Sequence, residues 1–139
     1  MIKEHPHFIV VDDDSFNNML CQLVITNRRT NVWGATYESF TMPEEALQHI
    51  KKNYAHPEAK LSVLLLDINM PEINGWEFLE YFNEFDKQIK ESFRIYILSS
   101  SVYDEDVERA RANANVVDFI SKPITLEKVK EIIDNNYQL

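Results

Sequence analysis

The strongest constraint on the fold of this chain comes from two short apolar runs that each end directly in aspartate. Residues 8–11 are followed by three aspartates at 12–14, and residues 63–66 are followed by Asp67. Continuous apolar runs of this length predict strands buried on both faces, as in a parallel sheet. In such sheets, ligands bind outside the carboxyl ends of the strands. The sequence therefore predicts that several carboxylates meet at a ligand-binding edge.

Strand and helix patterns alternate along the rest of the chain. After the polar leader, whose His5 and His7 we expect to be unstructured, Asp14-Ser15 offers a helix N-cap. The apolar residues that follow at helical spacing predict an amphipathic helix to about Asn27; they are Phe16, Met19, Leu20, Leu23 and Val24. The expected strands cover about 8–11, 36–40, 61–67, 94–98 and 116–121. The expected later helices cover about 43–53, 76–82, 104–113 and 126–137.

This strict (βα)5 alternation predicts an α/β fold in which a parallel five-stranded sheet carries helices on both faces. At 139 residues we expect one domain, residues 1–139, with its core at about 8–137. The flavodoxin-like three-layer sandwich, with strand order 2-1-3-4-5, is the natural choice at this size. That order makes strands one and three neighbours, so Asp12, Asp13 and Asp67 should converge.

Composition narrows the class of protein. A net charge of −9 argues against direct binding of nucleic acid, which needs clustered Lys and Arg. The chain has no apolar stretch of membrane-spanning length and no signal-peptide pattern, so we expect no membrane insertion and a cytoplasmic location. Its single cysteine, Cys21, lies in an apolar helical pattern and is interpreted as a buried thiol in a reducing compartment.

Polar residues also end the fourth and fifth expected strands, at Ser99 and at Lys122-Pro123. Carboxylates are ligands that Mg²⁺ prefers, and a lone carboxylate such as Asp67 can also accept a phosphoryl group. Lys122 and Mg²⁺ could neutralise the charge of that group, and the Ser99 hydroxyl could donate to one of its oxygens. Each residue alone is more simply a turn former or cap, but four strand ends together favour phosphoryl chemistry.

Four stretches carry a resemblance to a known family. They are Ile9-Val10-Val11-Asp12-Asp13, residues 64–75 (LLLDINMPEING), Ile97-Leu98-Ser99-Ser100, and residues 118–123 (DFISKP). Over nearly its whole length the chain resembles the CheY-like receiver domain of two-component response regulators. The Asp-x-x-Met-Pro-x-x-x-Gly element, combined with the acidic pair and Lys-Pro, is the most specific part of the match.

The resemblance implies a role for each matching position. Asp67 would be the phosphoacceptor, with Mg²⁺ or Mn²⁺ held directly by Asp13, Asp67 and the Asn69 carbonyl and through water by Asp12. The remaining implied residues act on the phosphoryl group or switch with it: Lys122 and Ser100 as phosphate-binding residues, Ser99 as both a phosphate ligand and a switch, and Phe119 as an aromatic switch. The Lys122–Pro123 peptide bond would be cis.

The resemblance also implies partners. A histidine kinase or histidine phosphotransfer protein would donate the phosphoryl group, and an unknown downstream protein would bind the face formed by 104–113, 116–121 and the last helix. A phosphorylation-dependent dimer is a further implied state. Because no output domain follows the last helix, we expect a stand-alone receiver that is not an enzyme beyond its own phosphorylation and dephosphorylation.

Three other interpretations use the same residues. A haloacid-dehalogenase-like phosphatase would use Asp12 as nucleophile and Asp14 as general acid, but it needs an acidic pair after the lysine, where this chain has Pro-Ile-Thr-Leu. A nucleotide- or flavin-binding module lacks its Gly-rich loop, because the chain has only Gly34 and Gly75. A degenerate receiver that acts only by binding would not need every signature position intact.

Overall fold

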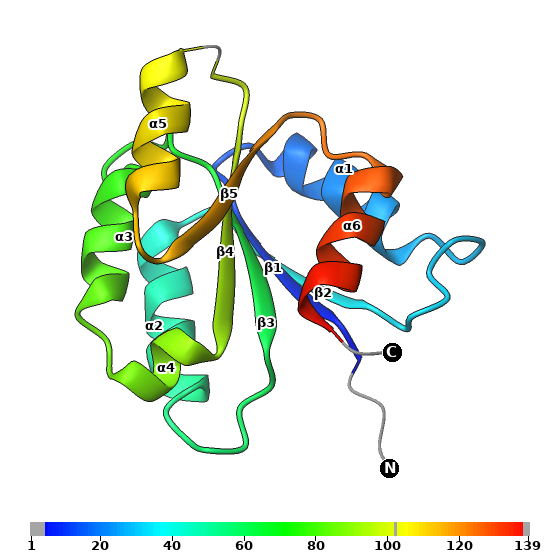
Figure 1. Ribbon diagram of the computed structural model, residues 1–139, viewed down its shortest axis with the longest axis horizontal. Helices are drawn as coiled ribbons and strands as arrows, with labels where there is room; N and C mark the ends of the chain where they lie inside the picture. Colours follow the sequence, from blue (N-terminus) through cyan, green and yellow to red (C-terminus); the bar gives the residue numbers. More distant parts are fainter. Residues whose placement is uncertain (1–4, 102, 138–139) are drawn as a thin grey trace.

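The computed structural model describes residues 5–101 and 103–137, which form one five-stranded sheet with helices on both faces (Figure 1). All strand pairs are parallel and the order is β2-β1-β3-β4-β5, as predicted. The strands are β1 (His7–Val11), β2 (Thr36–Phe40), β3 (Ser62–Leu66), β4 (Phe93–Ser99) and β5 (Val116–Ser121). The helices are α1 (Ser15–Thr26), α2 (Pro43–Asn53), α3 (Gly75–Asn83), α4 (Lys87–Glu91), α5 (Asp104–Ala112) and α6 (Leu126–Asn136).

Two apolar layers enclose the sheet. Alternate residues of β1 and β3 point to opposite faces, and both faces are covered, which explains why both strands are apolar at every position after the first. Ile9 and Leu64 pack beneath α2 and α3, whereas Phe8 and Leu65 pack beneath α1 and α6. Figure 1 shows α2, α3, α4 and α5 covering one face and α1 with α6 covering the other. This is the three-layer sandwich that the alternation predicts.

The structure divides the apolar residues of α1 between the core, where Val24 packs, and the solvent-exposed surface. Phe16, Met19 and Leu23 are 60%, 48% and 58% exposed. The buried residues are instead Asn17, Asn18, Cys21 and Ile25. Hydrogen bonds from the first two of these to Asp12 fix the rotation of the helix, so polar contacts at its start determine which apolar residues face the sheet. Apolar periodicity alone could not reveal that choice.

Two further features differ from the sequence expectations. The short helix α4 lies before β4, in a segment for which no helix was predicted. His7 is not part of an unstructured leader but begins β1, where its ring nitrogens contact Thr36 Oγ1 at 2.6 Å and Glu38 Oε2 at 2.7 Å. His49 Nε2 lies 3.3 Å from the other oxygen of the same Glu38 carboxylate. This cluster joins β1, β2 and α2 through one shared acid.

Candidate functional site at the carboxyl edge of the sheet

The register of β1 and β3 brings the predicted carboxylates together. Val11 pairs with Leu66, and the Asp67 N–H donates to the Val11 carbonyl at 3.0 Å, so Asp12 and Asp67 leave the sheet side by side. Carboxylate oxygens of Asp12, Asp13 and Asp67 all lie within 4.8 Å of one another. Parallel pairing of two non-consecutive strands therefore builds the acidic cluster that the sequence predicts.

The donor set of this cluster fits a hard divalent cation. Each of Asp12, Asp13 and Asp67 offers a carboxylate oxygen, and Mg²⁺ binds oxygen ligands while retaining several waters. Asp13 is exposed whereas the other two are buried, so the cluster is open to solvent on one side. Asn69, whose carbonyl was the fourth expected ligand, lies in the loop after β3 and is also exposed.

Lys122 directly follows β5, at the edge of the sheet, and its side chain extends to the acidic cluster. Its Nζ lies 2.6 Å from Asp12 Oδ2 and 3.6 Å from Asp67 Oδ1. Its backbone N–H donates to the Ser99 carbonyl at 2.9 Å, and its bond to Pro123 is cis, as the resemblance implies. Burial opposes the charge of the ammonium, but the hydrogen bond to Asp12 and the nearby carboxylates raise the pKa of Lys122 above its ordinary value. The lysine therefore stays cationic in the pocket.

Sequence reasoning missed the residues that hold Asp12. Its Oδ2 accepts from Asn17 Nδ2 at 2.9 Å, and its backbone carbonyl accepts from Asn18 Nδ2 at 3.0 Å. Its Oδ1 accepts from the Asp14 N–H at 2.9 Å. The sequence signal was the adjacent pair Asn17-Asn18 in the first turn of α1. Burying an amide side chain without a hydrogen-bond partner costs free energy, so such a pair indicates a polar partner nearby.

Asp67 has fewer polar contacts than Asp12, the other buried acid of the cluster, and its acidity is perturbed. Burial, reinforced by the negative charge of Asp12, raises the pKa of Asp67 to about 6, against the opposing effects of Lys122 and the Asn69 N–H. A raised pKa means that the folded protein stabilises the ionised form poorly when no cation is bound. The site therefore carries unfavourable negative charge that a divalent cation could neutralise.

The loop between Asp67 and α3 is held close to the site. At Gly75, a Cβ atom would lie 2.6 Å from the Asp67 carbonyl oxygen, which explains why no larger residue fits there. Asn74 caps α3 by accepting from the Glu77 N–H at 2.9 Å, while Glu77 accepts from the Asn74 N–H at 3.1 Å. This reciprocal capping box, which was not predicted, fixes where the loop ends and the helix begins.

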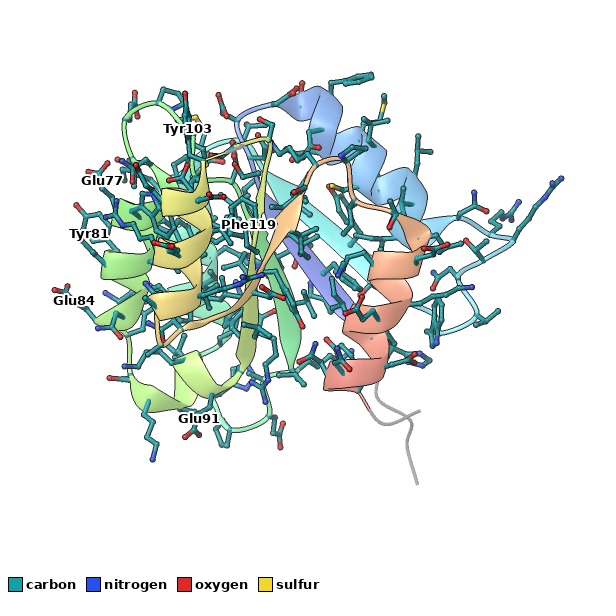
Figure 2. All side chains as sticks on the ribbon, turned by 45° about the horizontal axis from the view of Figure 1, so that its top comes forward. Glu77, Tyr81, Glu84, Glu91, Tyr103 and Phe119 are labelled. Carbon is teal, nitrogen blue, oxygen red and sulfur yellow. The ribbon has the colours of Figure 1, made fainter. Side chains whose placement is uncertain are left out.

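The expected switch and phosphate-binding residues occupy different environments. Ser99 is fully buried at the end of β4, and its Oγ accepts from the Ser101 N–H at 3.1 Å. Ser100 is exposed, and no hydrogen bond to the carboxylates involves it among the described residues. Phe119 is half-buried on β5 and packs against the core beneath α3 and α5 (Figure 2). Ser99 and Phe119 therefore lie on neighbouring strands, β4 and β5, and β5 in turn contacts α5.

Comparison with known proteins agrees with this geometry. Residues 8–134 match the family model of the response regulator receiver domain. The chain belongs to this family. It is a receiver domain, the phosphoacceptor module of two-component signalling. In the described part of the chain, no helix has the length and apolar composition needed to cross a membrane.

Individual relatives place the receiver domain among CheY-like proteins. It is 27% identical over 126 residues to the chemotaxis protein CheY of Thermotoga maritima, covering 91% of this chain and 92% of that protein. It is 28% identical over 126 residues to hybrid signal transduction histidine kinase L of Dictyostelium discoideum. That match covers 90% of this chain but only 7% of the kinase. The crystal structure of a two component response regulator from Cytophaga hutchinsonii is 27% identical, with a TM-score of 0.81 and coverage of 96% and 97%.

Proposed function

We propose that Asp67 is the residue of this receiver domain that accepts the phosphoryl group. The observation that carries the proposal is the difference in bonding between the two buried acids. Both oxygens of Asp12 already accept hydrogen bonds, and one of them also contacts Lys122 at 2.6 Å. Asp67 lies 3.6 Å from the same ammonium and accepts a backbone hydrogen bond from Asn69, so its oxygens are less occupied than those of Asp12. Availability of a nucleophilic oxygen therefore favours Asp67.

In the proposed reaction, an Asp67 carboxylate oxygen attacks phosphorus of a phosphohistidine. A new O–P bond forms, the N–P bond breaks, and the histidine nitrogen keeps the electron pair. Lys122 can turn from Asp12 to an oxygen of the phosphoryl group, because its ammonium already lies between the two acids. A hydroxyl donor for another oxygen is available at Ser99, because its Oγ accepts from the Ser101 N–H and keeps its own proton to donate.

We further propose that Asp12, Asp13 and Asp67 hold Mg²⁺ or Mn²⁺, with the Asn69 carbonyl as an additional ligand. Support comes from three oxygen ligands within 4.8 Å and from the raised pKa of Asp67. When bound, the cation would neutralise charge on the transferring phosphoryl group. The chain's own contribution is to fix the acids through β1, β3 and the amides of α1.

The phosphatase alternative fits the same residues poorly. It needs Asp14 as a general acid aimed at the pocket, but Asp14 Oδ1 accepts from the Phe16 N–H at 3.0 Å and caps α1. Asp14 also lies outside the group of acids whose oxygens converge. Receiver domains act in signalling rather than as turnover enzymes, and we propose the same of this chain.

The phosphoryl donor of this chain is proposed to be a histidine kinase or histidine phosphotransfer protein that contacts α1. Phe16, Met19 and Leu23 form a continuous exposed apolar strip along this helix. The helix begins directly after Asp14, so the strip lies beside the site that a donor histidine must reach. Exposed apolar residues in such a strip favour contact with another protein.

We propose that phosphorylation is read out on the face formed by α5, β5 and α6. Movement of Ser99 toward a phosphoryl group would alter the loop before α5, and Phe119 lies half-buried beside that helix. α5 contributes only Ala110 to the buried core, so its displacement disrupts little packing. Four further expectations stay predictions: dimerisation on phosphorylation, binding of a downstream partner, action without an output domain, and a cytoplasmic location.

The test of the phosphoacceptor combines mass spectrometry with chemical trapping. After incubation with acetyl phosphate and Mg²⁺, one phosphoryl group should be added, and borohydride reduction should convert the acyl phosphate at position 67 to homoserine. Asp67→Asn should abolish the labelling. A homoserine found at position 12 would transfer the assignment to the phosphatase-like nucleophile, and labelling that persists in Asp67→Asn would contradict the proposal.

A further inference from the structure

We propose that a groove between α2 and the α3–α4 segment binds an amphipathic helix of a partner protein, one that carries basic side chains beside an aliphatic or aromatic anchor residue. None of the residues that line this groove belongs to the carboxylate site, α5, β5 or α6. The proposal therefore concerns a second interaction surface, and it does not depend on phosphorylation of Asp67.

The groove has the size and the apolar floor that an anchor side chain needs. It encloses about 560 Å³, within the range of roughly 300–1,000 Å³ that is typical of binding pockets. Apolar side chains from three helices and from the segment after α2 line it, namely Leu47, Ala55, Tyr81, Phe85 and Ile89. Tyr81 is 53% exposed although it borders this cavity. An aromatic ring at the rim of an apolar hollow is a suitable contact for an inserted side chain.

Charge determines what kind of helix can occupy the groove. Residues 75–86 contain four acidic side chains and no Lys, Arg or His. Figure 2 shows Glu77, Tyr81 and Glu84 projecting outward along one edge of α3. Among the residues that the structure describes, Glu84 and Asp86 at the rim form no ion pair. A partner with Lys or Arg here would relieve the mutual repulsion of these acids, whereas an acidic partner would increase it.

Two residues of the α3 side, Tyr81 and Glu84, line the groove and are three positions apart, so a partner helix could contact both. Glu77, Tyr81 and Glu84 follow each other at four and three positions, so they lie on one face of α3. A partner helix packed beside α3 presents its own side chains at the same intervals. Lys51 of α2 lines the opposite wall. Because one wall is acidic and the other carries a lysine, the basic side chains of the partner would face α3.

The position of the groove suggests an adaptor role. On its other side α3 contacts α5, where the Arg109 guanidinium carbon lies 4.5 Å from the centre of the Trp76 ring. A helix bound between α2 and α3 would leave the α5–β5–α6 face accessible. The receiver domain could then hold one partner permanently in the groove and another only when phosphorylated.

The experiment is a selection that does not require knowledge of the partner. A displayed library of helical peptides is selected against the full chain carrying Asp67→Asn, so that phosphorylation plays no part. We expect enrichment of peptides with Lys or Arg around a Leu, Phe or Trp. Enrichment of acidic or uncharged peptides, or of no helical peptides, would overturn the proposal. Because the target lacks the acceptor, neither result bears on the phosphoacceptor assignment.

Matched variants locate the binding of the enriched peptides. Binding should weaken at least tenfold with Glu84→Lys/Asp86→Lys, and with Tyr81→Ala as a second variant without a charge change. It should persist with Glu105→Lys/Glu108→Lys, which makes the same charge change on α5. Circular dichroism checks that each variant is folded. Equal binding to both double variants would place the peptides elsewhere and overturn the proposal. A dimer of the chain alone that Tyr81→Ala dissociates would instead make a second copy the occupant.

Discussion

Lys122 is bonded to Asp12 rather than to Asp67. Its Nζ lies 2.6 Å from Asp12 Oδ2, a full ångström closer than to Asp67 Oδ1 at 3.6 Å. The ammonium thus stabilises the acid that Asn17 already holds, and the proposed acceptor is left with less compensation for its burial. This arrangement leaves negative charge at the site that a divalent cation could neutralise.

The first prediction concerns the pH dependence of stability. Burial and the charge of Asp12 raise the pKa of Asp67 to about 6 in the folded protein, above the usual value of about 4 for an aspartate. The sign follows from linkage: this group favours folding below about pH 4, and the benefit is lost as pH rises through 6. Without divalent cations, Asp67→Asn should therefore be more stable than the wild type at pH 8, by about 3 kcal/mol. Urea unfolding at pH 4–8 checks this, and a difference independent of pH would contradict it.

The second prediction concerns cation binding. Mg²⁺ should raise the melting temperature of the wild type, because ligand binding to the folded state stabilises it. In Asp13→Ala most of this rise should be lost, since one of three converging carboxylates is removed. Asp14→Asn is the matched control, because the amide oxygen can still cap α1 and the residue lies outside the cluster. Equal Mg²⁺ effects in wild type and Asp13→Ala would indicate another binding site.

The third prediction tests the orientation of α1. Asn17→Ala removes a buried donor to Asp12 and should lower the free energy of unfolding by about 1–3 kcal/mol. Phe16→Ala, at an exposed neighbouring position, should change it by less than about 0.5 kcal/mol. Chemical denaturation of both variants gives the comparison. The reverse order would show that α1 is rotated and that Phe16 belongs to the core.

The fourth prediction separates docking from chemistry. If the exposed strip on α1 contacts the donor, Phe16→Ala/Leu23→Ala should slow phosphoryl transfer from a cognate histidine kinase by about tenfold or more. Labelling by acetyl phosphate should remain at the wild-type rate, because a small donor needs no protein contact. Rapid-quench assays with both donors measure the two rates. Equal slowing with both donors would mean that the substitutions damage the site itself.

The fifth prediction tests whether a change at the carboxylate site alters the environment of α5. Beryllofluoride, a phosphoryl mimic, should change the tryptophan fluorescence, because Trp76 lies in the first turn of α3 after the Asp67 loop and is stacked by Arg109 of α5. The change should be lost in Trp76→Phe and kept in Trp33→Phe. NMR shifts should extend to Phe119 and α5. Shifts confined to the carboxylate pocket would place the readout surface elsewhere.

The sequence alone predicted the architecture because that information is local and repeated. Apolar runs at residues 8–11 and 63–66 identified strands buried on both faces, and βα alternation limited the topology. Because the two strands are parallel neighbours in the predicted order, the aspartates that directly follow them lie at the same edge of the sheet. For this reason the strand order and the acidic cluster were both predicted, and the structure confirms them.

Only the tertiary structure decided which way α1 faces, which acid Lys122 contacts and where a groove forms. Apolar spacing predicted an amphipathic helix at α1 but could not show that Phe16 and Met19 face solvent, while amide bonds to Asp12 turn Asn17 and Asn18 inward. That preference depends on a partner in another segment, which no local pattern contains. The groove beside Tyr81 likewise forms because α2, α3 and α4 converge in space. Contacts between distant segments, rather than local propensity, set these details.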